Sequence, residues 1–222
     1  MKPVAFLFFS IVCITTIAQV PVSKEPRHHP VFENRKVRIL NVLLPPGDTT
    51  QYHVHTTPSV FIMLSRTRTG SQLLNQQPGA SGLPDVGNVF FENLSAPHIR
   101  IHRVWNMDTS VFHVMDIELL SKDTGFIQKP LQAKHLSLKT DTAWARIYKI
   151  ELGKNDGLSI NENKRNLILV SLKDSNTSLR INGKESASHL VTGNYFWINA
   201  GDKFSLKNSD APLAGFALIE VK

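Results

Sequence analysis

The sequence predicts an all-β protein that consists of two small barrels of antiparallel strands. Short stretches that alternate between apolar and polar residues recur along the 222-residue chain, and Gly, Pro, Asn and Asp separate them. Helical periodicity is almost absent after the first 18 residues. The predicted strands fall into two sets of similar number and length, which indicates an internal duplication of one barrel.

Residues 1–18 have the pattern of a secretory signal peptide. Lys2 supplies a positive charge, an apolar core follows, and Thr16-Ile17-Ala18 forms a small-x-small cleavage site. The apolar core is shorter than the ~20 residues that a membrane-spanning helix needs. We therefore expect cleavage after Ala18 and an exported bacterial protein, periplasmic or secreted, without stable membrane insertion.

Cys13 is the only cysteine of the chain, so the mature protein has no disulfide and no thiolate. Any metal must then be bound by His, Asp, Glu or Asn. A lipoprotein acylated at Cys13 is not favoured, because Val12 is not the small residue that normally precedes the acylated cysteine. The net charge of +7 becomes +6 without Lys2, from 24 Lys and Arg against 18 Asp and Glu. The basic residues form no dense run and no basic-aromatic stripe, so nucleic-acid binding is not indicated.

The first barrel is predicted at residues 31–120. Its expected strands are residues 37–43, 51–55, 60–65, 88–92, 99–104 and 111–119. Residues 70–87 are rich in Gln, Gly, Pro and Ser, and this composition predicts a long loop over the barrel mouth or edge.

A linker is predicted at residues 121–142, with a short helix or an extended arm, because this segment carries a Gly, a Pro and several Lys residues. The second barrel is predicted at residues 143–222. Its expected strands are residues 145–152, 157–160, 167–172, 178–181, 188–191, 195–198, 203–207 and 215–221.

Two histidines separated by one residue, His53 and His55, lie in a predicted strand. Alternate residues of a strand share one face, so both imidazoles point the same way. Two such imidazoles suit a transition metal if another strand supplies a third ligand, and His102 is the candidate for it.

The histidine pair stands in a pattern that resembles the first motif of the cupin superfamily, whose members are jelly-roll barrels. Gly47 is followed by five residues and then by His53-Val54-His55, without a gap. The position of the motif's glutamate is occupied by Ser59 or Val60, so that carboxylate ligand is missing.

The second cupin motif is also similar to a segment of this chain. Pro97, His102 and Asn106 stand at the expected spacing, while Ile99 replaces the internal glycine and the leading glycine is displaced to Gly87. Together with the lead-in at residues 32–39, the resemblance covers residues 31–120.

The resemblance implies that His53, His55 and His102 converge inside the first barrel and bind one divalent transition metal, Fe, Mn, Zn, Ni or Cu. Three imidazoles leave coordination positions open for a small-molecule ligand. The fourth ligand is left open between Glu92, His98 and water. Cupin barrels often pair through their sheets, so a homodimer is a further expectation.

The second half of the chain resembles a degenerate cupin. Gly193, Asn199, Gly201 and Asn208 keep the spacing of the second motif, and Phe204 stands in place of the histidine. Asn161 and Asn163 fall roughly where the His-x-His pair would be. Amides bind transition metals weakly, so we expect a barrel that kept its fold and lost its metal.

The remaining histidines are not expected to be ligands. We expect His113 to be structural, and the others to be solvated in tails, linker or strand ends: His28, His29, His135 and His189.

Two functions are compatible with these patterns. The first is a metal-dependent bicupin enzyme, a dioxygenase or an isomerase acting on a small molecule. The second is a non-catalytic binding or interaction protein with a vestigial cupin site, which the missing glutamate favours.

Overall fold

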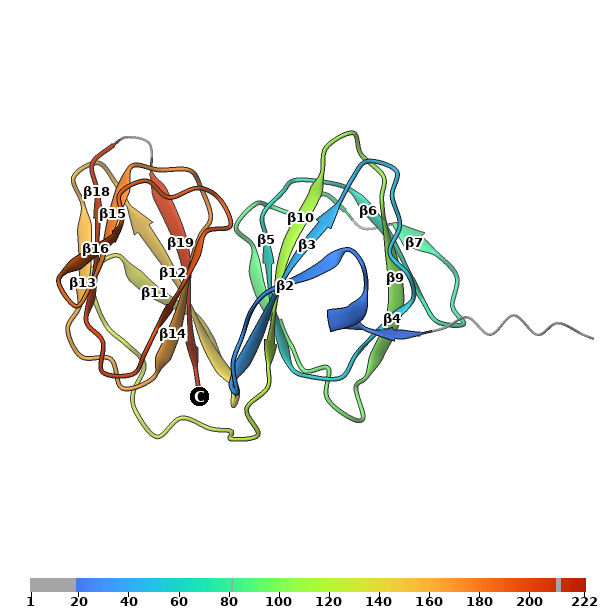
Figure 1. Ribbon diagram of the computed structural model, residues 1–222, viewed down its shortest axis with the longest axis horizontal. Helices are drawn as coiled ribbons and strands as arrows, with labels where there is room; N and C mark the ends of the chain where they lie inside the picture. The colour runs from blue at the N-terminus through green and yellow to red at the C-terminus, as the bar shows by residue number, and fades with distance from the viewer. Residues whose placement is uncertain (1–18, 81, 211–212) are drawn as a thin grey trace, which may run out of the picture.

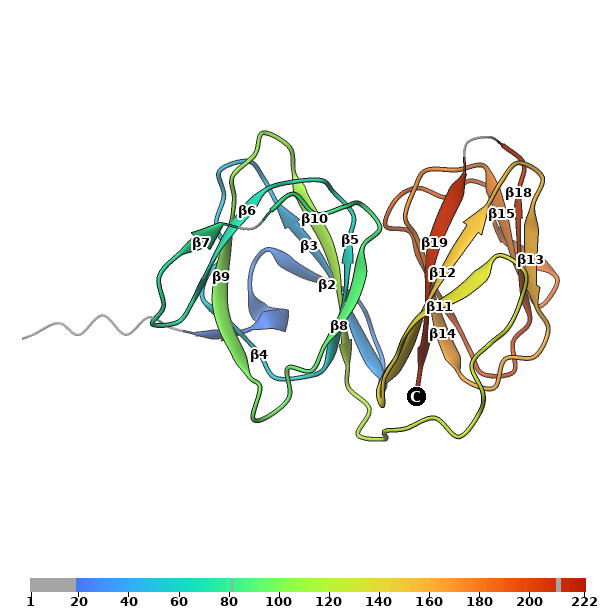
Figure 2. The same ribbon diagram turned by 180° about the vertical axis from the view of Figure 1, so that it is seen from behind.

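The protein folds into two β-barrels that stand side by side, as the computed structural model of the chain shows (Figures 1 and 2). The structure describes residues 19–80, 82–210 and 213–222. The predicted signal peptide lies outside the described residues. The described residues contain no helix long and apolar enough to cross a membrane.

The first barrel is formed by two five-stranded sheets. In spatial order, one sheet contains β1 (Val20–Pro21), β4 (His53–His55), β9 (Arg100–Asn106), β6 (Thr69–Leu73) and β7 (Gly79–Ala80). The other contains β2 (His28–Glu33), β3 (Val37–Leu44), β10 (Phe112–Leu119), β5 (Ser59–Met63) and β8 (Val89–Glu92). A short 3-10 helix, η1 (Val22–Lys24), connects β1 to β2.

The second barrel repeats this arrangement with one five-stranded and one four-stranded sheet. The larger sheet contains β11 (Leu136–Asp141), β12 (Ala145–Leu152), β19 (Ala214–Val221), β14 (Asn166–Ser171) and β17 (Tyr195–Ile198). The smaller sheet contains β13 (Gly157–Ile160), β18 (Phe204–Asn208), β15 (Thr177–Ile181) and β16 (Lys184–Ala187).

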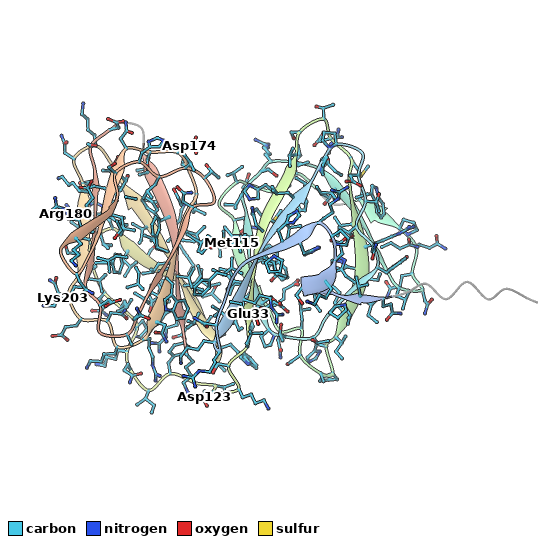
Figure 3. All side chains as sticks on the ribbon, viewed as in Figure 1. Glu33, Met115, Asp123, Asp174, Arg180 and Lys203 are labelled. Carbon is cyan, nitrogen blue, oxygen red and sulfur yellow. The ribbon has the colours of Figure 1, made fainter. Side chains whose placement is uncertain are left out.

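The two barrels share one hydrophobic core, which lies between them. Strand β10 shows why, because Met115 and Ile117 point away from the first barrel and pack with Ile147 and Ile219 of the second. Figure 3 shows Met115 between the barrels. Stacked aromatic pairs extend this contact: Phe32 with Trp197, and Phe91 with Trp144, at centroid distances of 5.5 and 5.6 Å.

The interiors of the two barrels differ. Large side chains fill the second barrel, among them Tyr148, Phe204 and Phe216. The apolar cluster inside the first barrel is much smaller and is centred on Leu44 and Phe112. This smaller filling leaves room for a cavity in the first barrel.

An asparagine anchor recurs at the same place in both barrels and supports the internal duplication. Asn106 of β9 donates hydrogen bonds to the carbonyl oxygens of Leu44 and Ser110, at 2.9 and 2.7 Å. Asn208 of β18 donates to the carbonyl oxygens of Leu152 and Asp210, at 3.0 and 2.8 Å. Each asparagine therefore ties the end of one sheet to the end of the opposite sheet.

Several strands differ from those expected from the sequence. Strand β2 was not expected because it is an edge strand that contains Pro30, which lies beside a register irregularity. Strands β6 and β7 lie within residues 70–87 or overlap them, where a loop was expected, and β6 has little apolar alternation. The expected linker contains β11, an edge strand paired with β12. Residues 188–191 form only an isolated bridge, and the strand lies at Lys184–Ala187 instead.

Candidate metal centre

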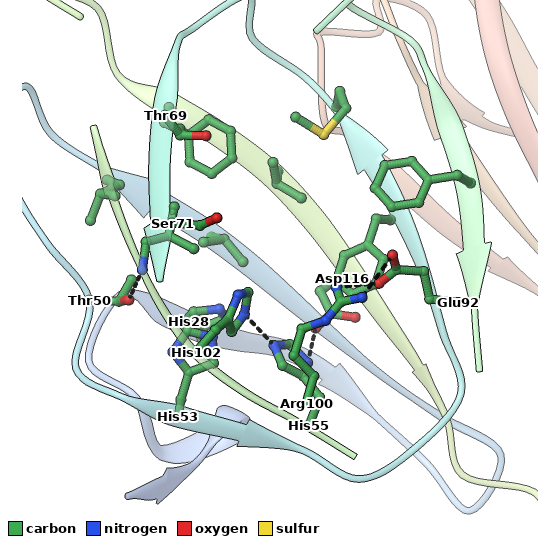
Figure 4. A pocket seen from close by; sticks show the side chains of 18 residues that line it. His28, Thr50, His53, His55, Thr69, Ser71, Glu92, Arg100, His102 and Asp116 are labelled. Carbon is green, nitrogen blue, oxygen red and sulfur yellow. Dashed lines mark hydrogen bonds and ion pairs between the residues drawn. The ribbon is translucent and has the colours of Figure 1, made fainter. Parts of the chain in front are cut away.

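Strands β4 and β9 bring three histidines together inside the first barrel (Figure 4). The strands are antiparallel, and His53 pairs directly with His102. His55 lies on the same face of β4 as His53, two residues along the strand. The alternation expected from the sequence therefore turns all three imidazoles into the barrel.

The three histidines form a compact cluster. Their candidate ligand atoms all lie within 4.8 Å of one another. The Nε2 atoms of His55 and His102 are 3.1 Å apart. His53 and His55 are 1% and 3% exposed. Nitrogens bound to a common transition metal at about 2.1 Å lie roughly 3 to 3.5 Å apart, so a small ring rotation closes the set around one ion.

One hydrogen bond of His53 shows which of its two ring nitrogens is free to bind a metal. Its Nδ1 donates to the carbonyl oxygen of Gln51 at 2.9 Å, which leaves the lone pair on Nε2. This Nε2 is buried and has no hydrogen-bond partner among the described residues. A buried acceptor without a partner is costly, and a metal ion would satisfy it. The three residues thus fit a divalent transition metal by the chemistry of their donor atoms.

The surroundings keep these imidazoles neutral. Burial, and next the neighbouring His28, lowers the pKa of His53 to about 4. Burial, and next His53 and Arg100, lowers the pKa of His102 to about 3. Burial, and next the neighbouring His53 and His102, lowers the pKa of His55 strongly. Neutral imidazole is the form that binds metal, so the cluster is in its ligating form at neutral pH.

A buried pair formed by Glu25 and His28 lies beside the cluster. Nδ1 of His28 donates to the Glu25 carboxylate at 2.6 Å, and its ring lies 4.6 Å from that of His53. Burial raises the pKa of Glu25, but hydrogen bonds from His28 and from the backbone of Gln51 and Arg27 outweigh this and lower it.

The prediction that His28 is solvated is wrong, because strand β2 turns its ring inward, where it is 7% exposed. Sequence reasoning missed this pair because Pro30 interrupts the alternation of residues 28–33. The other three histidines of that group lie away from the cluster, and His113 is hydrogen-bonded to Asn41 on the outer face of β10.

Neither side chain considered as the fourth ligand joins the three histidines. Glu92 lines the same cavity, but its carboxylate makes an ion pair with Arg100 at 2.5 and 3.1 Å. His98 is exposed and lies next to a separate surface hollow. Asp116, which sequence reasoning did not single out, is buried at the cavity wall, 3.6 Å from Nδ1 of His55. Burial, and next the charge of Glu118, raises the pKa of Asp116 well above its usual range, while the hydroxyl of Ser59 opposes this.

A cavity of about 310 Å³ opens onto the three histidines. Its remaining wall is mostly apolar, and its polar part includes Arg100 and Glu92. The apolar lining includes Phe61, Met63, Phe90, Val104, Phe112 and Val114. The space suits a small molecule that reaches the histidines through an apolar chamber.

The second barrel has no counterpart of this cluster among its described residues. Phe204 pairs with Ile160 at the register where His102 pairs with His53. The counterparts of His53 and His55 are therefore Ile160 and Glu162, rather than the expected asparagines. Asn161 is exposed, and Asn163 is a structural residue that donates to the carbonyl oxygen of Asn199 at 2.9 Å.

Two tandem barrels of this topology, with a histidine cluster inside the first, have the bicupin fold, which confirms the predicted pair of cupin-type jelly rolls. YhhW from Escherichia coli is similar, with a TM-score of 0.59 and 13% identity over 89% of each chain. A Cupin 2 conserved barrel domain protein from Leptotrichia buccalis has a TM-score of 0.55 and 9% identity, over 87% of this chain and 88% of that one.

Salicylate 1,2-dioxygenase from Pseudoaminobacter salicylatoxidans, whose structure contains gentisate adducts, is also similar. Its TM-score is 0.60 at 9% identity, over 86% of this chain and 70% of that one. The sequence matches no protein-family model and no curated protein. At these identities the likeness establishes the fold.

Proposed function

We propose that this chain is an exported, metal-dependent bicupin enzyme. Its N-terminal barrel holds one divalent transition metal on His53, His55 and His102, and it acts on a small molecule as a dioxygenase or an isomerase. The C-terminal barrel has a structural role. One observation carries the proposal: three buried, neutral imidazoles converge at the wall of a cavity large enough for a substrate.

The chemistry of the bound metal would be Lewis acidity and, for a redox-active ion, electron transfer to and from its ligands. The residues of the chain would hold the ion, exclude bulk water and orient the ligand. The three histidines would hold the ion at the wall of the cavity, where a ligand in the cavity could reach it. The apolar wall around Phe61 and Phe112 excludes bulk water from this side. Arg100 and Glu92 add a polar edge that orients a ligand within the chamber.

The similarity to salicylate 1,2-dioxygenase supports small aromatic acids as the first substrates to assay. Oxygen consumption is measured with the metal-loaded protein and a panel of such acids. Consumption that requires both the metal and one of the acids supports the dioxygenase assignment. Conversion without oxygen consumption supports an isomerase.

The metal content of the purified protein tests the proposal. The protein is prepared without chelator and analysed by plasma mass spectrometry beside His53→Ala and His102→Ala. His29→Ala is the matched control, because His29 is exposed on the strand that also carries His28. The proposal predicts near-stoichiometric metal in the wild type and in His29→Ala, and loss in the other two. An unchanged metal content in both cluster variants contradicts it.

A second candidate is a binding protein without catalysis. The observation that favours it is the absence of the first-motif glutamate, whose position is taken by Ser59 or Val60. Such a protein would bind its small molecule equally well after the metal has been removed. Calorimetric titration of the metal-free and metal-loaded protein distinguishes the two functions, because only the enzyme requires the ion.

Export and self-association are parts of the same proposal. The sequence pattern around Ala18 supports cleavage there and a periplasmic or secreted protein. Mass spectrometry of the N-terminal peptide of the mature protein tests this, with Gln19 as the expected first residue. Light scattering after gel filtration tests for a homodimer, which by mass is twice the mature chain.

A further inference from the structure

Strand β10 carries two buried carboxyl groups on the face that points into the first barrel. Asp116 and Glu118 are 1% and 3% exposed, and they alternate along the strand. Glu118 accepts hydrogen bonds from Nη1 of Arg38 at 2.7 Å and from the hydroxyl of Thr57 at 3.0 Å. Neither oxygen of Asp116 accepts a hydrogen bond of good geometry among the described residues, although the hydroxyl of Ser59 lies close enough to lower its pKa. The two neighbours therefore differ in one respect, which is that only Glu118 is paired.

An unpaired carboxyl group in the barrel wall opposes folding. Burial of a polar group without a hydrogen bond costs more than an apolar side chain of similar size. Strand pairing does not require a carboxyl group here, because Asp116 lies opposite Leu40 and Phe61 in the sheet. An apolar residue at this position would satisfy the strand pairing equally well.

The polar group that faces Asp116 is also unpaired. Nδ1 of His55 lies 3.6 Å from Oδ2 of Asp116, and it has no hydrogen-bond partner among the described residues. Nε2 of the same ring lies on the cluster side, 3.1 Å from Nε2 of His102. The imidazole of His55 thus stands between the cluster and the carboxyl group, with one nitrogen toward each.

Metal binding by His55 would use both nitrogens of its ring. When Nε2 of a neutral imidazole binds an ion, the ring proton is on Nδ1. In His55 that proton points toward Asp116, and a shortening of about half an ångström brings the two atoms within hydrogen-bond range. His53 already has the equivalent support from the carbonyl oxygen of Gln51.

We propose that Asp116 is a positioning residue of the metal centre, which accepts the Nδ1 hydrogen of His55 and so directs Nε2 to the metal. The inference rests on the proposed metal site and deepens it. Asp116 acts from behind His55, so it would orient the ring without occupying a coordination position. The side of the cluster that faces the cavity would stay open to a ligand.

Zinc and cobalt binding to the metal-free protein test this role. The variants are Asp116→Leu, which removes the acceptor, and Asp116→Asn, which keeps an oxygen of the same shape. Zinc affinity is measured by competition with a chromophoric chelator. We expect Asp116→Leu to weaken zinc binding about 10- to 100-fold and Asp116→Asn to weaken it less. The metal-free form of Asp116→Leu should melt at or above the wild-type temperature, because this substitution removes a buried polar group.

Two further measurements separate positioning from a general structural effect. Glu118→Gln is the matched control, and it should lower the melting temperature of the metal-free protein while zinc affinity stays at the wild-type value. In the proton spectrum of the cobalt-loaded wild type, the Nδ1 hydrogen of His55 should give a signal protected from solvent exchange. That signal should lose its protection in Asp116→Leu.

The outcomes distinguish this inference from the proposed function. If the wild type binds zinc on the three histidines and both Asp116 variants bind it equally well, the positioning role is wrong and the metal site stands. If Asp116→Leu loses affinity only together with its melting temperature, as a structural residue would, the role is also wrong. If the wild type binds neither ion, the proposed metal site and the positioning role both fail.

Discussion

Close packing around single residues holds the strand that carries His102. Gly70 of β6 lies under the indole of Trp105 of β9, its direct partner across the sheet. A Cβ atom at Gly70 would lie 2.0 Å from Cε2 of Trp105, which is well inside van der Waals contact. The absent side chain at Gly70 is therefore a condition for the regular pairing of β6 with β9.

We predict that Gly70→Ala destabilises the protein. The methyl group must displace the indole or separate the strands, and overpacking of this kind costs about 1–3 kcal/mol. Urea unfolding monitored by tryptophan fluorescence measures the change. Gly79→Ala is the control, because a Cβ at Gly79 meets no atom within 4 Å. Equal stability of the two variants would show that Trp105 has room to move.

Strand ends depend on the asparagine anchors of the two barrels. Asn106 and Asn208 each bridge the end of their own strand to the last carbonyl of a strand in the opposite sheet, Leu44 of β3 and Leu152 of β12. The two anchors are alike in geometry, but only Asn106 lies on a histidine-bearing strand. Substituting each asparagine in turn therefore separates an effect on the stability of the fold from an effect on the histidine cluster.

We expect Asn106→Ala and Asn208→Ala to lower the free energy of unfolding by similar amounts, about 1–3 kcal/mol each, because buried carbonyl groups lose their donors. Only Asn106→Ala should also weaken metal binding, since it frees the end of the strand that holds His102. Chemical unfolding and zinc titration on both variants check this. Equal loss of zinc affinity in both would contradict a site confined to the first barrel.

At the level of elements, strand alternation made the central strands and the histidine cluster predictable. His53 and His55 share a face because they stand two residues apart in one strand. His102 was identified by its spacing to Asn106. Edge strands such as β2 and β11 were missed because at least half of their residues face water and carry little apolar pattern. Asp116 was missed because no local pattern shows that a buried residue lacks a partner.

The counterpart of the histidine pair in the second barrel was placed one residue too far along. Asn155 corresponds to Gly47 in the turn before this strand, and both have positive φ. The distance along the chain from that turn residue to the residue paired with His102 or Phe204 is one residue shorter in the second barrel, from Asn155 to Ile160 against Gly47 to His53. Only the pairing of Ile160 with Phe204 reveals this shift.

The two barrels are joined by one buried apolar cluster with side chains from both. The core between them takes side chains from β3, β5 and β10 on one side and from β12, β14 and β19 on the other. Neither barrel can be separated without exposing Ile117 or Ile219 to water. The filled second barrel therefore supports the hollow first one, and the metal site gains a rigid wall at β10.

We predict that the protein unfolds in one cooperative transition. Removal of one barrel exposes the shared core, and this cost couples the two barrels. Scanning calorimetry should give a single peak whose calorimetric and van't Hoff enthalpies agree. Two resolved transitions would show that the barrels are independent.

Metal binding should raise the stability of the whole molecule. An ion that binds only the folded state stabilises it by about 2.7 kcal/mol at a free concentration 100 times Kd. The melting temperature should therefore fall on addition of a chelator and recover with added zinc. An unchanged melting temperature in His53→Ala under the same treatment is the expected control result.

The proposed function depends on a single transition metal held by His53, His55 and His102. Anomalous diffraction from crystals of the metal-loaded protein, collected on both sides of the absorption edge of the ion, tests it most directly. We expect one strong anomalous peak within about 2.0–2.3 Å of a nitrogen of each of the three rings. A peak bound elsewhere, or no peak in crystals grown with saturating metal, would contradict it.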